Sequence, residues 1–402
     1  MTPVLIVLNA GSSSLKFQVY DMLDGAEPQL VWKGLYEGLG DTAHFIVKDA
    51  DGTILEEKTW VGGNQTGHEE ALMHLVSWLS QFREERKPVA IGHRVVHGGE
   101  TFSAPVLVDE SVVQRLELLV PLAPLHQPHN LEPIRIVRRR LPGMPQVACF
   151  DTAFHQTQSD IATLFALPRE MRESGVRRYG FHGLSYDYIS SVLKDYEPRL
   201  AEGRVIVAHL GNGASLCALK DGVSVATTMG FSALDGLPMG TRCGAIDAGV
   251  VFYMLREMKL SPDEAEGVLY KRSGLLGVSG LSNDMRVLRG HAATNADAKR
   301  AIDMFVYRIT REIGSLVAAL GGIDGLVFTA GIGENDVATR AEVMAGLAWT
   351  GLTLDDAINR TGGPCISSGD GPMAWVIPTN EELVIARQTR SVLGGMQAKL
   401  AS

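Results

Sequence analysis

One pattern occurs three times along this chain: a short apolar segment with the character of a buried strand, followed at once by a turn of small residues. The apolar segments cover residues 4–8, 204–210 and 325–329. The turns directly after them cover residues 9–14, 211–215 and 330–335. Backbone N–H groups in a turn of glycine and serine can approach an anion closely. Three such turns favour a site for a polyphosphate ligand over three ordinary hairpins.

Helical patterns separate these strands along the chain. We expect helices at about 67–85, 184–196, 247–258 and 297–319, another from about 336, and a C-terminal one at about 380–402 that packs back on the N-terminal domain. Strands interleaved with helices indicate an α/β protein. A chain of 402 residues has room for about two to three domains. We place a boundary near residue 150, where an apolar strand at 146–150 ends at Asp151.

The first two strand–turn units also resemble each other. Each turn leads into a further extended segment, at 15–20 after the first turn and at 216–219 after the second. This arrangement indicates either an internal duplication or two unrelated hairpins. The pattern alone does not decide between them.

Composition and charge exclude several classes of protein. With 45% apolar residues and a net charge of −9, the chain is neither intrinsically disordered nor a general nucleic-acid binder, which needs a basic face. No apolar stretch approaches the ~18 residues of a membrane span, and no secretory signal is visible. The four cysteines form no CxxC pair, which is typical of reduced thiols in a cytosolic protein. A Walker A motif, a GxSxG elbow and an HExxH zinc motif are all missing.

Charged residues stand among glycines at several points. Arg94 lies in a glycine-containing segment at 92–99, His182 lies between Gly180 and Gly183, and Arg242 lies between Gly240 and Gly244. Each alone is compatible with a surface salt bridge or a structural histidine. Together with Asp151 just past a strand end, they indicate phosphoryl transfer, which needs cations for developing charge and carboxylates for a metal.

Nine short motifs, in order along the chain, carry a resemblance to a known family. They cover residues 9–16, 92–99, 150–155, 179–183, 209–213, 239–244, 282–286, 329–335 and 378–383. With these motifs the sequence resembles the acetate kinases, the acetokinase family within the sugar kinase/Hsp70/actin superfamily. The resemblance implies an α/β, two-domain, actin-like ATPase (ribonuclease H-like) fold with a duplicated core and an interdomain cleft. It implies an N-terminal domain of residues 1–150 plus 384–402, and a nucleotide-binding domain of residues 151–383.

Carried over position by position, the resemblance implies a role for each matching residue. The catalytic residues would be Asp151, His182, Arg242 and His126. The substrate-binding residues would be Arg94, which holds the carboxylate, and Val96, Leu125 and Phe181 around the methyl group. The metal would lie at Asn9 and Glu381. The nucleotide-binding residues would be Ser12, Ser14, Lys16, His209, Leu210, Gly211, Asn212, Gly213, Asp284, Met285, Arg286, Gly331, Ile332, Gly333, Glu334 and Asn335.

The implied reaction is ATP plus acetate giving ADP plus acetyl phosphate, reversibly and by direct in-line transfer. Acetate, with a pKa near ~4, is already ionised at pH 7, so the site needs cations more than a strong base. Arg94, Arg242, Lys16 and Mg²⁺, or Mn²⁺ in its place, would supply that charge. Asp151 would then orient Arg94 or the acetate, or help to organise the metal and water, rather than act as a base. The resemblance further implies a cytoplasmic homodimer with ATP/ADP and acetate/acetyl phosphate as partners, and with no nucleic-acid or membrane partner.

Two alternatives stay open at this point. Where the family often has proline in the acyl pocket, this chain has Ala233, which would loosen the pocket. Because one methylene is worth only ~1–3 kcal/mol of discrimination, a propionate or butyrate kinase with the same site is the nearest alternative. A non-catalytic, actin-like nucleotide-binding protein is an alternative of a different class.

Overall fold

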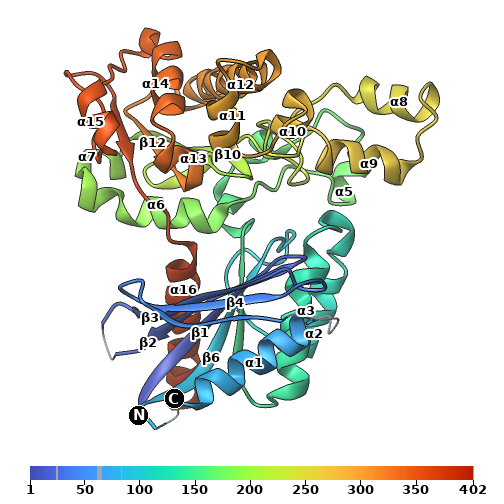
Figure 1. The fold of residues 1–402 in the computed structure, drawn as a ribbon, viewed down its shortest axis with the longest axis vertical. Coiled ribbons are helices and arrows are strands. Elements are labelled where there is room, and N and C mark those ends of the chain that lie inside the picture. Colours follow the sequence, from blue (N-terminus) through green and yellow to red (C-terminus); the bar gives the residue numbers. More distant parts are fainter. Residues whose placement is uncertain (24–25, 61–65, 83, 402) are drawn as a thin grey trace. The chain divides into compact units, whose positions relative to one another are not determined.

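The computed structural model describes residues 1–23, 26–60, 66–82 and 84–401 and divides into two compact units. The first unit is Met1–Ala153 with Asn380–Ser402, and the second is Phe154–Thr379 (Figure 1). The chain thus leaves the first unit after Ala153 rather than after residue 150, and returns at Asn380 rather than at 384. Local bonds explain both shifts. Asp151 still pairs with Arg94 of the first unit, and the Asn380 side chain accepts from the Leu383 N–H at the start of the last helix.

An eight-stranded sheet forms the middle of the first unit. Its strands are β1 (Thr2–Ala10), β2 (Ser14–Asp21), β3 (Gln29–Glu37), β4 (His44–Asp49), β5 (Ile54–Thr59), β6 (Arg86–Val95), β7 (Val106–Leu107) and β8 (Gln146–Phe150). Their spatial order is β5-β4-β3-β2-β1-β6-β8-β7. Strand β1 pairs antiparallel with β2 and parallel with β6, and β6 pairs parallel with β8. The predicted strands of this half are therefore confirmed.

Helices cover both faces of this sheet, because its central strands are apolar on both sides. Along β1, Val4, Ile6 and Leu8 pack with residues of α1 (His68–Ser80) and α3 (Gln127–Arg140). The alternate residues of β1 face the opposite side, where α16 (Glu381–Ala401) packs on β1, β6 and β8. The packing of the C-terminal helix on this half is thus confirmed. The remaining helices of the first unit are α2 (Glu110–Glu117) and the short 3-10 helix η1 (Val120–Leu122).

The second unit repeats the central topology of the first. Its strands are β9 (Arg204–Leu210), β10 (Ala214–Lys220), β11 (Val223–Thr227), β12 (Gly325–Thr329) and β13 (Met373–Val376), in the order β11-β10-β9-β12-β13. Strand β9 is antiparallel to β10 and parallel to β12, and β12 is parallel to β13. This matches β3-β2-β1-β6-β8 in both order and direction. The repeat favours the internal duplication over two unrelated hairpins.

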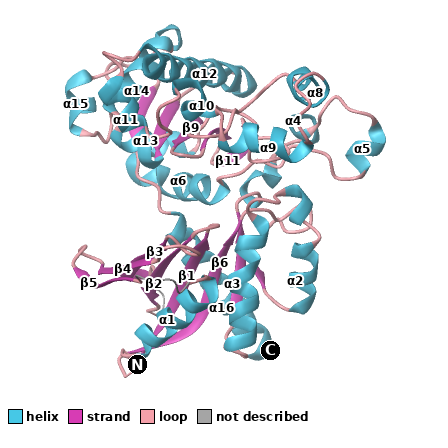
Figure 2. Cartoon of the chain, turned by 45° about the vertical axis from the view of Figure 1, so that its right-hand side comes forward, coloured by secondary structure: helices cyan, strands magenta, loops and turns pink. Residues whose placement is uncertain are grey.

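Helices also cover both faces of the second sheet (Figure 2). Residues of α6 (Gly183–Tyr196) form a core with Val205, Val207 and Val327, and α12 (Ala296–Leu320) packs on β9, β10 and β11. The other helices of this unit are η2 (Ala153–Thr157), α4 (Asp160–Thr163), α5 (Arg169–Glu173), α7 (Pro198–Ala201), α8 (Ala248–Arg256), α9 (Pro262–Lys271), α10 (Gly274–Ser279), α11 (Met285–His291), α13 (Ala330–Asn335), α14 (Val337–Gly346), η3 (Ala348–Thr350) and α15 (Asp356–Thr361).

Two predicted elements differ from the structure. Helix α1 ends at Ser80, short of the expected residue 85. Residues 330–335 form the helix α13 instead of an open turn. A left-handed Ala330 (φ +64°) makes the sharp change of direction after β12, and the Glu334 carboxylate accepts from the Ala330 N–H at 2.8 Å. This bond satisfies one of the N–H groups that a helix start leaves unpaired.

Across the described ranges, no helix has both the length and the apolar character needed to cross a membrane.

Candidate functional site

Three polar side chains of the first unit gather where parallel strands end. Asn9 lies near the end of β1, Arg94 near the end of β6, and Asp151 directly after β8. The β1–β6 pairing ends one residue before Asn9 and Arg94, and Asp151 follows the last β6–β8 pair, Val95 with Phe150. By alternation all three side chains lie on the face covered by α16. Glu381 is the first residue of α16. The topology therefore brings together four of the predicted residues, at the strand ends where open α/β sheets bind ligands.

A buried ion pair forms the centre of this group. The Arg94 Nε and Nη2 atoms donate to the Asp151 carboxylate at 3.0 Å and 2.7 Å, and the Asp151 side chain is only 1% exposed. The third guanidinium nitrogen, Nη1, lies 3.7 Å from Glu381 Oε2. Because the planar guanidinium of Arg94 is held on two edges, its N–H donors keep a fixed arrangement. This fixed set of donors, called the fork below, suits a carboxylate ligand.

Burial sets the electrostatics of the group. Burial raises the pKa of Glu381 to about 7, and the Asp151 carboxylate adds to this while Arg94 opposes it. Burial lowers the pKa of Arg94, but the carboxylates of Asp151 and Glu381 outweigh burial and hold it above the ordinary value. Arg94 therefore stays charged. Glu381 can therefore be either protonated or ionised near neutral pH, and a nearby divalent cation would favour the ionised form.

A cavity of about 300 Å³ opens beside this group in the first unit. It is lined by Asn9, Ala10, Gly11, Ser12, Ser14, Arg94, Val96, Leu125, His126, His129 and Asn130. The lining combines polar donors with the apolar side chains of Val96 and Leu125, which suits a small anion with an apolar end. Seven of the predicted site residues lie in this lining, whereas Lys16, Asp151 and Glu381 do not.

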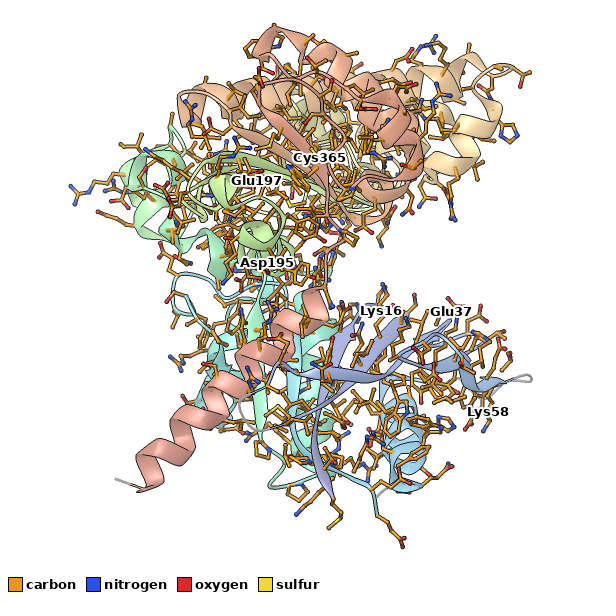
Figure 3. All side chains as sticks on the ribbon, turned by 90° about the vertical axis from the view of Figure 1, so that its left-hand side faces the viewer. Lys16, Glu37, Lys58, Asp195, Glu197 and Cys365 are labelled. Carbon is orange, nitrogen blue, oxygen red and sulfur yellow. The ribbon has the colours of Figure 1, made fainter. Side chains whose placement is uncertain are left out.

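Lys16 reaches the same end of the sheet from β2. It stands opposite Asn9 in the β1–β2 register, and its side chain is exposed. Figure 3 shows Lys16 and Glu37 at the same edge of the first unit. Lys16 is therefore placed on a strand and not in the turn itself, close to the Ser12 and Ser14 hydroxyls in sequence and next to Asn9 in the sheet.

Helix α3 supplies the rest of the cavity wall. His126 lies in the turn directly before α3 as the N-cap residue of this helix, and Pro128 lies in the first turn of the helix. His129 and Asn130 lie three and four residues further on, so they share one face of the helix with His126. Sequence reasoning missed both residues. The signal that could have found them is this helical spacing, which was hidden because the helix itself was not predicted.

In the second unit, two histidines stack beside the glycine-rich turn between β9 and β10. The rings of His182 and His209 lie 4.3 Å apart at 20°. His182 Nδ1 bonds with Ser215 Oγ at 2.8 Å, and His209 Nδ1 bonds with Ser185 Oγ at 2.8 Å. Both rings are held through Nδ1, which fixes where each Nε2 points.

The close approach of two side chains to the Gly213 backbone favours glycine at this turn. A Cβ added there would lie 3.1 Å from His182 Nε2 and 3.3 Å from Arg242 Nη2. The other terminal nitrogen of Arg242 donates to the Ala233 carbonyl at 2.6 Å. An imidazole and a guanidinium therefore converge on the turn. Two fixed donors aimed at one place stabilise negative charge as it develops.

A second cavity, of about 670 Å³, lies within the second unit. It is lined by Gly211, Asn212, Asn283, Asp284, Met285, Arg286, Arg289, Gly331, Ile332, Asn335 and Asp336. Eight of these were predicted as nucleotide-binding residues. Asn283, Arg289 and Asp336 were missed, although Arg289 lies one helical turn from Met285 and the other two adjoin predicted positions.

Several predicted nucleotide-binding residues lie outside this lining. Leu210 is fully buried in β9, and Gly333 is buried in α13. The Glu334 carboxylate accepts from the Ala330 and Thr379 N–H groups at 2.8 Å and 3.2 Å, so it shapes the backbone. In the lining itself, a side-chain hydrogen bond from Arg286 lowers the pKa of Asp284. Asp284 also caps α11.

Phe181 and Ala233, predicted for the acyl pocket, lie in the second unit. Phe181 is 1% exposed, and its carbonyl bonds with His155 Nε2 at 2.9 Å. Ala233 is 9% exposed. Val96 and Leu125 line the cavity of the first unit.

The donor set of the first unit fits Mg²⁺ better than a transition metal. Within residues 1–23, 26–60, 66–82 and 84–401, no three His, Cys, Asp or Glu side chains are grouped to hold a metal ion. Mg²⁺ is usually held by one or two protein oxygens together with water and substrate phosphate. One amide, Asn9, and one carboxylate, Glu381, at the same end of the sheet meet that requirement.

Comparisons with known proteins agree along the whole chain. A family model described as the acetokinase family matches residues 4–387. An acetate kinase from Rhodopseudomonas palustris (strain ATCC BAA-98 / CGA009) is 50% identical over 400 residues, covering 98% of this chain and 100% of that protein. A crystal structure of a propionate kinase from Francisella tularensis superposes with a TM-score of 0.90 at 37% identity, covering 98% of this chain and 100% of the other. A crystal structure of an acetate kinase from Porphyromonas gingivalis gives a TM-score of 0.86 at 36% identity, covering 97% and 100%.

Proposed function

The chain belongs to the acetokinase family and is a kinase that phosphorylates acetate, and we propose that its first unit binds the acyl substrate while its second unit binds ATP or ADP. Its paired sheets of repeated topology are the actin-like ATPase fold of that family. The observation that carries the function is the full-length similarity to acetate kinases. The comparisons favour this enzyme over the non-catalytic actin-like protein that the sequence left open.

Arg94 binds the carboxylate of acetate in this proposal. Its guanidinium is fixed by Asp151 and Glu381, and it faces the cavity that Val96 and Leu125 also line. The apolar pair contacts the methyl group, and His126 contacts the substrate from the start of α3. Asp151, buried and bonded to two nitrogens of Arg94, holds that fork in place and is not needed as a base. A fixed fork contributes by positioning the attacking oxygen for in-line transfer.

His182 and Arg242 stabilise the transferring phosphoryl group. Both converge on the turn at Gly213, which supplies backbone N–H groups for the phosphates. Acetate and ATP are both anions, so their approach needs positive charge on the protein. Arg94, Arg242 and Lys16 provide it, and the reaction then depends on positioning and electrostatic stabilisation.

The 670 Å³ cavity binds the adenosine. Its lining includes Met285, Gly331, Ile332 and Asn335. The remaining predicted residues act beside it. His209, Gly211, Asn212 and Gly213 form the phosphate turn together with Leu210, while Gly333 and Glu334 shape α13. Ser12, Ser14 and Lys16 form the phosphate-binding group of the first unit.

Asn9 and Glu381 would hold Mg²⁺ in the first unit. When bound, the ion supplies charge neutralisation to the phosphate oxygens, and Mn²⁺ would substitute for it. The cytoplasm, where ATP and ADP are available, is the proposed location.

The reverse reaction tests this function. The purified chain is mixed with ADP, Mg²⁺ and acetyl phosphate, and luciferase light reports the ATP formed. We expect ATP to appear only when protein, metal and acetyl phosphate are all present, and EDTA to abolish it until excess Mg²⁺ or Mn²⁺ is added. Absence of ATP under the complete conditions would refute the function. Full activity in EDTA would refute only the metal assignment.

Replacement of Gly213 by alanine tests the convergence on the phosphate turn. The added Cβ forces His182 Nε2 or Arg242 Nη2 to shift by a few tenths of an ångström. A misplacement of ~1 Å at a catalytic group costs about 100-fold, so this smaller shift is expected to lower kcat by up to about tenfold. Steady-state kinetics with ATP and acetate measure the effect. Gly267→Ala in α9, where a Cβ meets open space, is the matched control and should leave kcat unchanged. A Gly213→Ala enzyme with normal kcat contradicts the proposed geometry.

We also propose that the chain forms a homodimer through α8. No residue of this apolar helix is buried within the chain, and Phe252 and Tyr253 are 52% and 58% exposed. Contiguous exposed apolar side chains mark interaction sites, and a two-fold homodimer is the commonest assembly that covers them.

Introducing charge at α8 tests the dimer. The double variant Phe252→Glu with Tyr253→Glu is expected to halve the mass measured by light scattering after gel filtration, because two carboxylates of each protomer would be buried in the interface. Tyr307→Glu, at an exposed site in α12, should keep the wild-type mass. The dimer proposal fails if the wild type is a monomer or if the double variant stays dimeric.

Propionate is the second candidate acyl substrate. The chain is similar to a propionate kinase of known structure, and Ala233 stands where the family often has proline. Ala233 also accepts a hydrogen bond from Arg242 through its carbonyl, so a change in this segment affects both the pocket wall and a catalytic residue.

A further inference from the structure

Asn130 makes two buried hydrogen bonds that join the ends of two catalytic strands. Its Oδ1 accepts from the Val96 N–H at 2.9 Å, and its Nδ2 donates to the Ala10 carbonyl at 2.8 Å. The residue is 6% exposed. Because the amide oxygen accepts and the amide nitrogen donates, both sides of the side chain are used. Leucine or aspartate of similar size could not make both bonds.

The position of these bonds explains why an amide is needed. The β1–β6 pairing ends at Leu8 and His93, so Ala10 and Val96 lie just beyond the last paired residues. Their backbone groups are buried and need partners. The first turns of α3 supply such partners, since Gln127 likewise bonds the N–H and carbonyl of His97 at 3.2 Å and 3.0 Å. Side chains of α3 thus take the place of a neighbouring strand.

Both backbone segments that Asn130 bonds belong to the cavity of the first unit. Ala10 and Val96 line it, and so does Asn130 itself. Val96 is 7% exposed and forms part of the apolar wall. A single rigid amide therefore fixes the separation between the wall that carries Val96 and the turn that follows Asn9.

We propose that Asn130 is a positioning residue that sets the width of the acyl pocket and so selects acetate over longer acids. This rests on the proposed function, in which the cavity binds the acyl group. With the amide in place, Val96 is held against the methyl group. Without it, the Val96 backbone loses its anchor, the side-chain volume of Asn130 is vacated, and an extra methylene fits.

The test compares acetate with propionate for Asn130→Ala. Acyl phosphate is trapped with hydroxylamine, and kcat/KM is measured for both acids. We expect kcat/KM for acetate to fall and the propionate-to-acetate ratio to rise about tenfold, the lower end of what one methylene is worth. Gln146→Ala is the control, because this buried amide of the same unit bonds the Ile134 carbonyl and does not line the cavity. Its ratio should equal that of the wild type.

Other outcomes are equally informative. A fall for both acids by the same factor, with an unchanged ratio, would show that Asn130 only supports the fold and would overturn the proposal. If Asn130→Ala does not fold, as judged by circular dichroism, Asn130→Ser takes its place, because its hydroxyl is too short to bridge the two segments. If neither variant folds, Asn130 belongs to the folding core and the proposal is also overturned. A wild type that makes no acyl phosphate from either acid refutes the proposed function instead, which separates the two failures.

Discussion

Arg94→Ala is expected to lower kcat/KM for acetate by about 100- to 1000-fold, the loss seen when one fixed donor is removed from a transition state. The physical reason is that Asp151 and Glu381 hold the guanidinium of Arg94 in a fixed position, so the variant removes a set of fixed donors from the cavity lining. The variant also leaves Asp151, 1% exposed, without its partner. Breaking one side of a buried ion pair costs about 3–5 kcal/mol. Unfolding in urea, measured beside kinetics, separates the two effects.

Two further variants distinguish the role of Arg94 in activity from its role in stability. Arg94→Lys keeps the charge but loses the two-edged fork, so it should recover stability more than activity. Arg86→Ala is the matched control, since Arg86 lies on the same strand and pairs with Asp21 through two nitrogens at 2.9 Å and 3.2 Å, away from the cavity. It should lose some stability and keep kcat/KM. Equal losses of activity in Arg94→Ala and Arg86→Ala would mean that Arg94 acts only through the fold.

Arg242→Ala should lower kcat by about 100- to 1000-fold while changing the nucleotide Kd far less. Arg242 does not line the 670 Å³ cavity assigned to adenosine, but its Nη2 lies beside the phosphate turn. We therefore expect Arg242 to stabilise the transition state of phosphoryl transfer more than it stabilises bound nucleotide. Steady-state kinetics and calorimetric titration with ADP measure the two quantities.

Arg204→Ala is the control for this second variant. Arg204 is also in the second unit and donates to Asp324 at 2.9 Å, yet it lies outside the cavity lining. It should keep kcat within a small factor. An Arg242→Ala enzyme with normal kcat, or one whose only defect is weak nucleotide binding, is incompatible with the proposed role.

The secondary structure that the sequence predicted well is the part set by local pattern. The apolar strands at 4–8 and 204–210 are confirmed as β1 and β9, because buried strands need continuous apolar residues. The long helix at 297–319 is confirmed as α12, whose amphipathic spacing is visible without any tertiary information. Helix α13 was missed because its start depends on a left-handed Ala330 and on the hydrogen bond that the Ala330 N–H donates to the Glu334 carboxylate, and neither leaves a periodic signal in the sequence.

The candidate site was predictable only in part. The strand pattern at 146–150 predicted that Asp151 follows a strand end, and the structure places Asp151 directly after β8. The pairing of Arg94 with Asp151 joins residues 57 apart in sequence, so it depends on the order β1-β6-β8, which no local pattern specifies. The role of Asn130 could not be predicted from the sequence for a related reason. An amide that bridges two backbone segments looks like any surface asparagine until both strands are in place.

Acyl-hydroxamate formation measures the choice of acyl acceptor directly. The purified chain is incubated with ATP, Mg²⁺ and hydroxylamine in the presence of acetate, propionate or butyrate, and the acyl hydroxamate formed gives kcat/KM for each acid. We expect product from acetate, a lower kcat/KM for propionate and a still lower kcat/KM for butyrate. A higher kcat/KM for propionate or butyrate would contradict the acetate assignment, and no hydroxamate from any of the three acids would contradict the kinase itself.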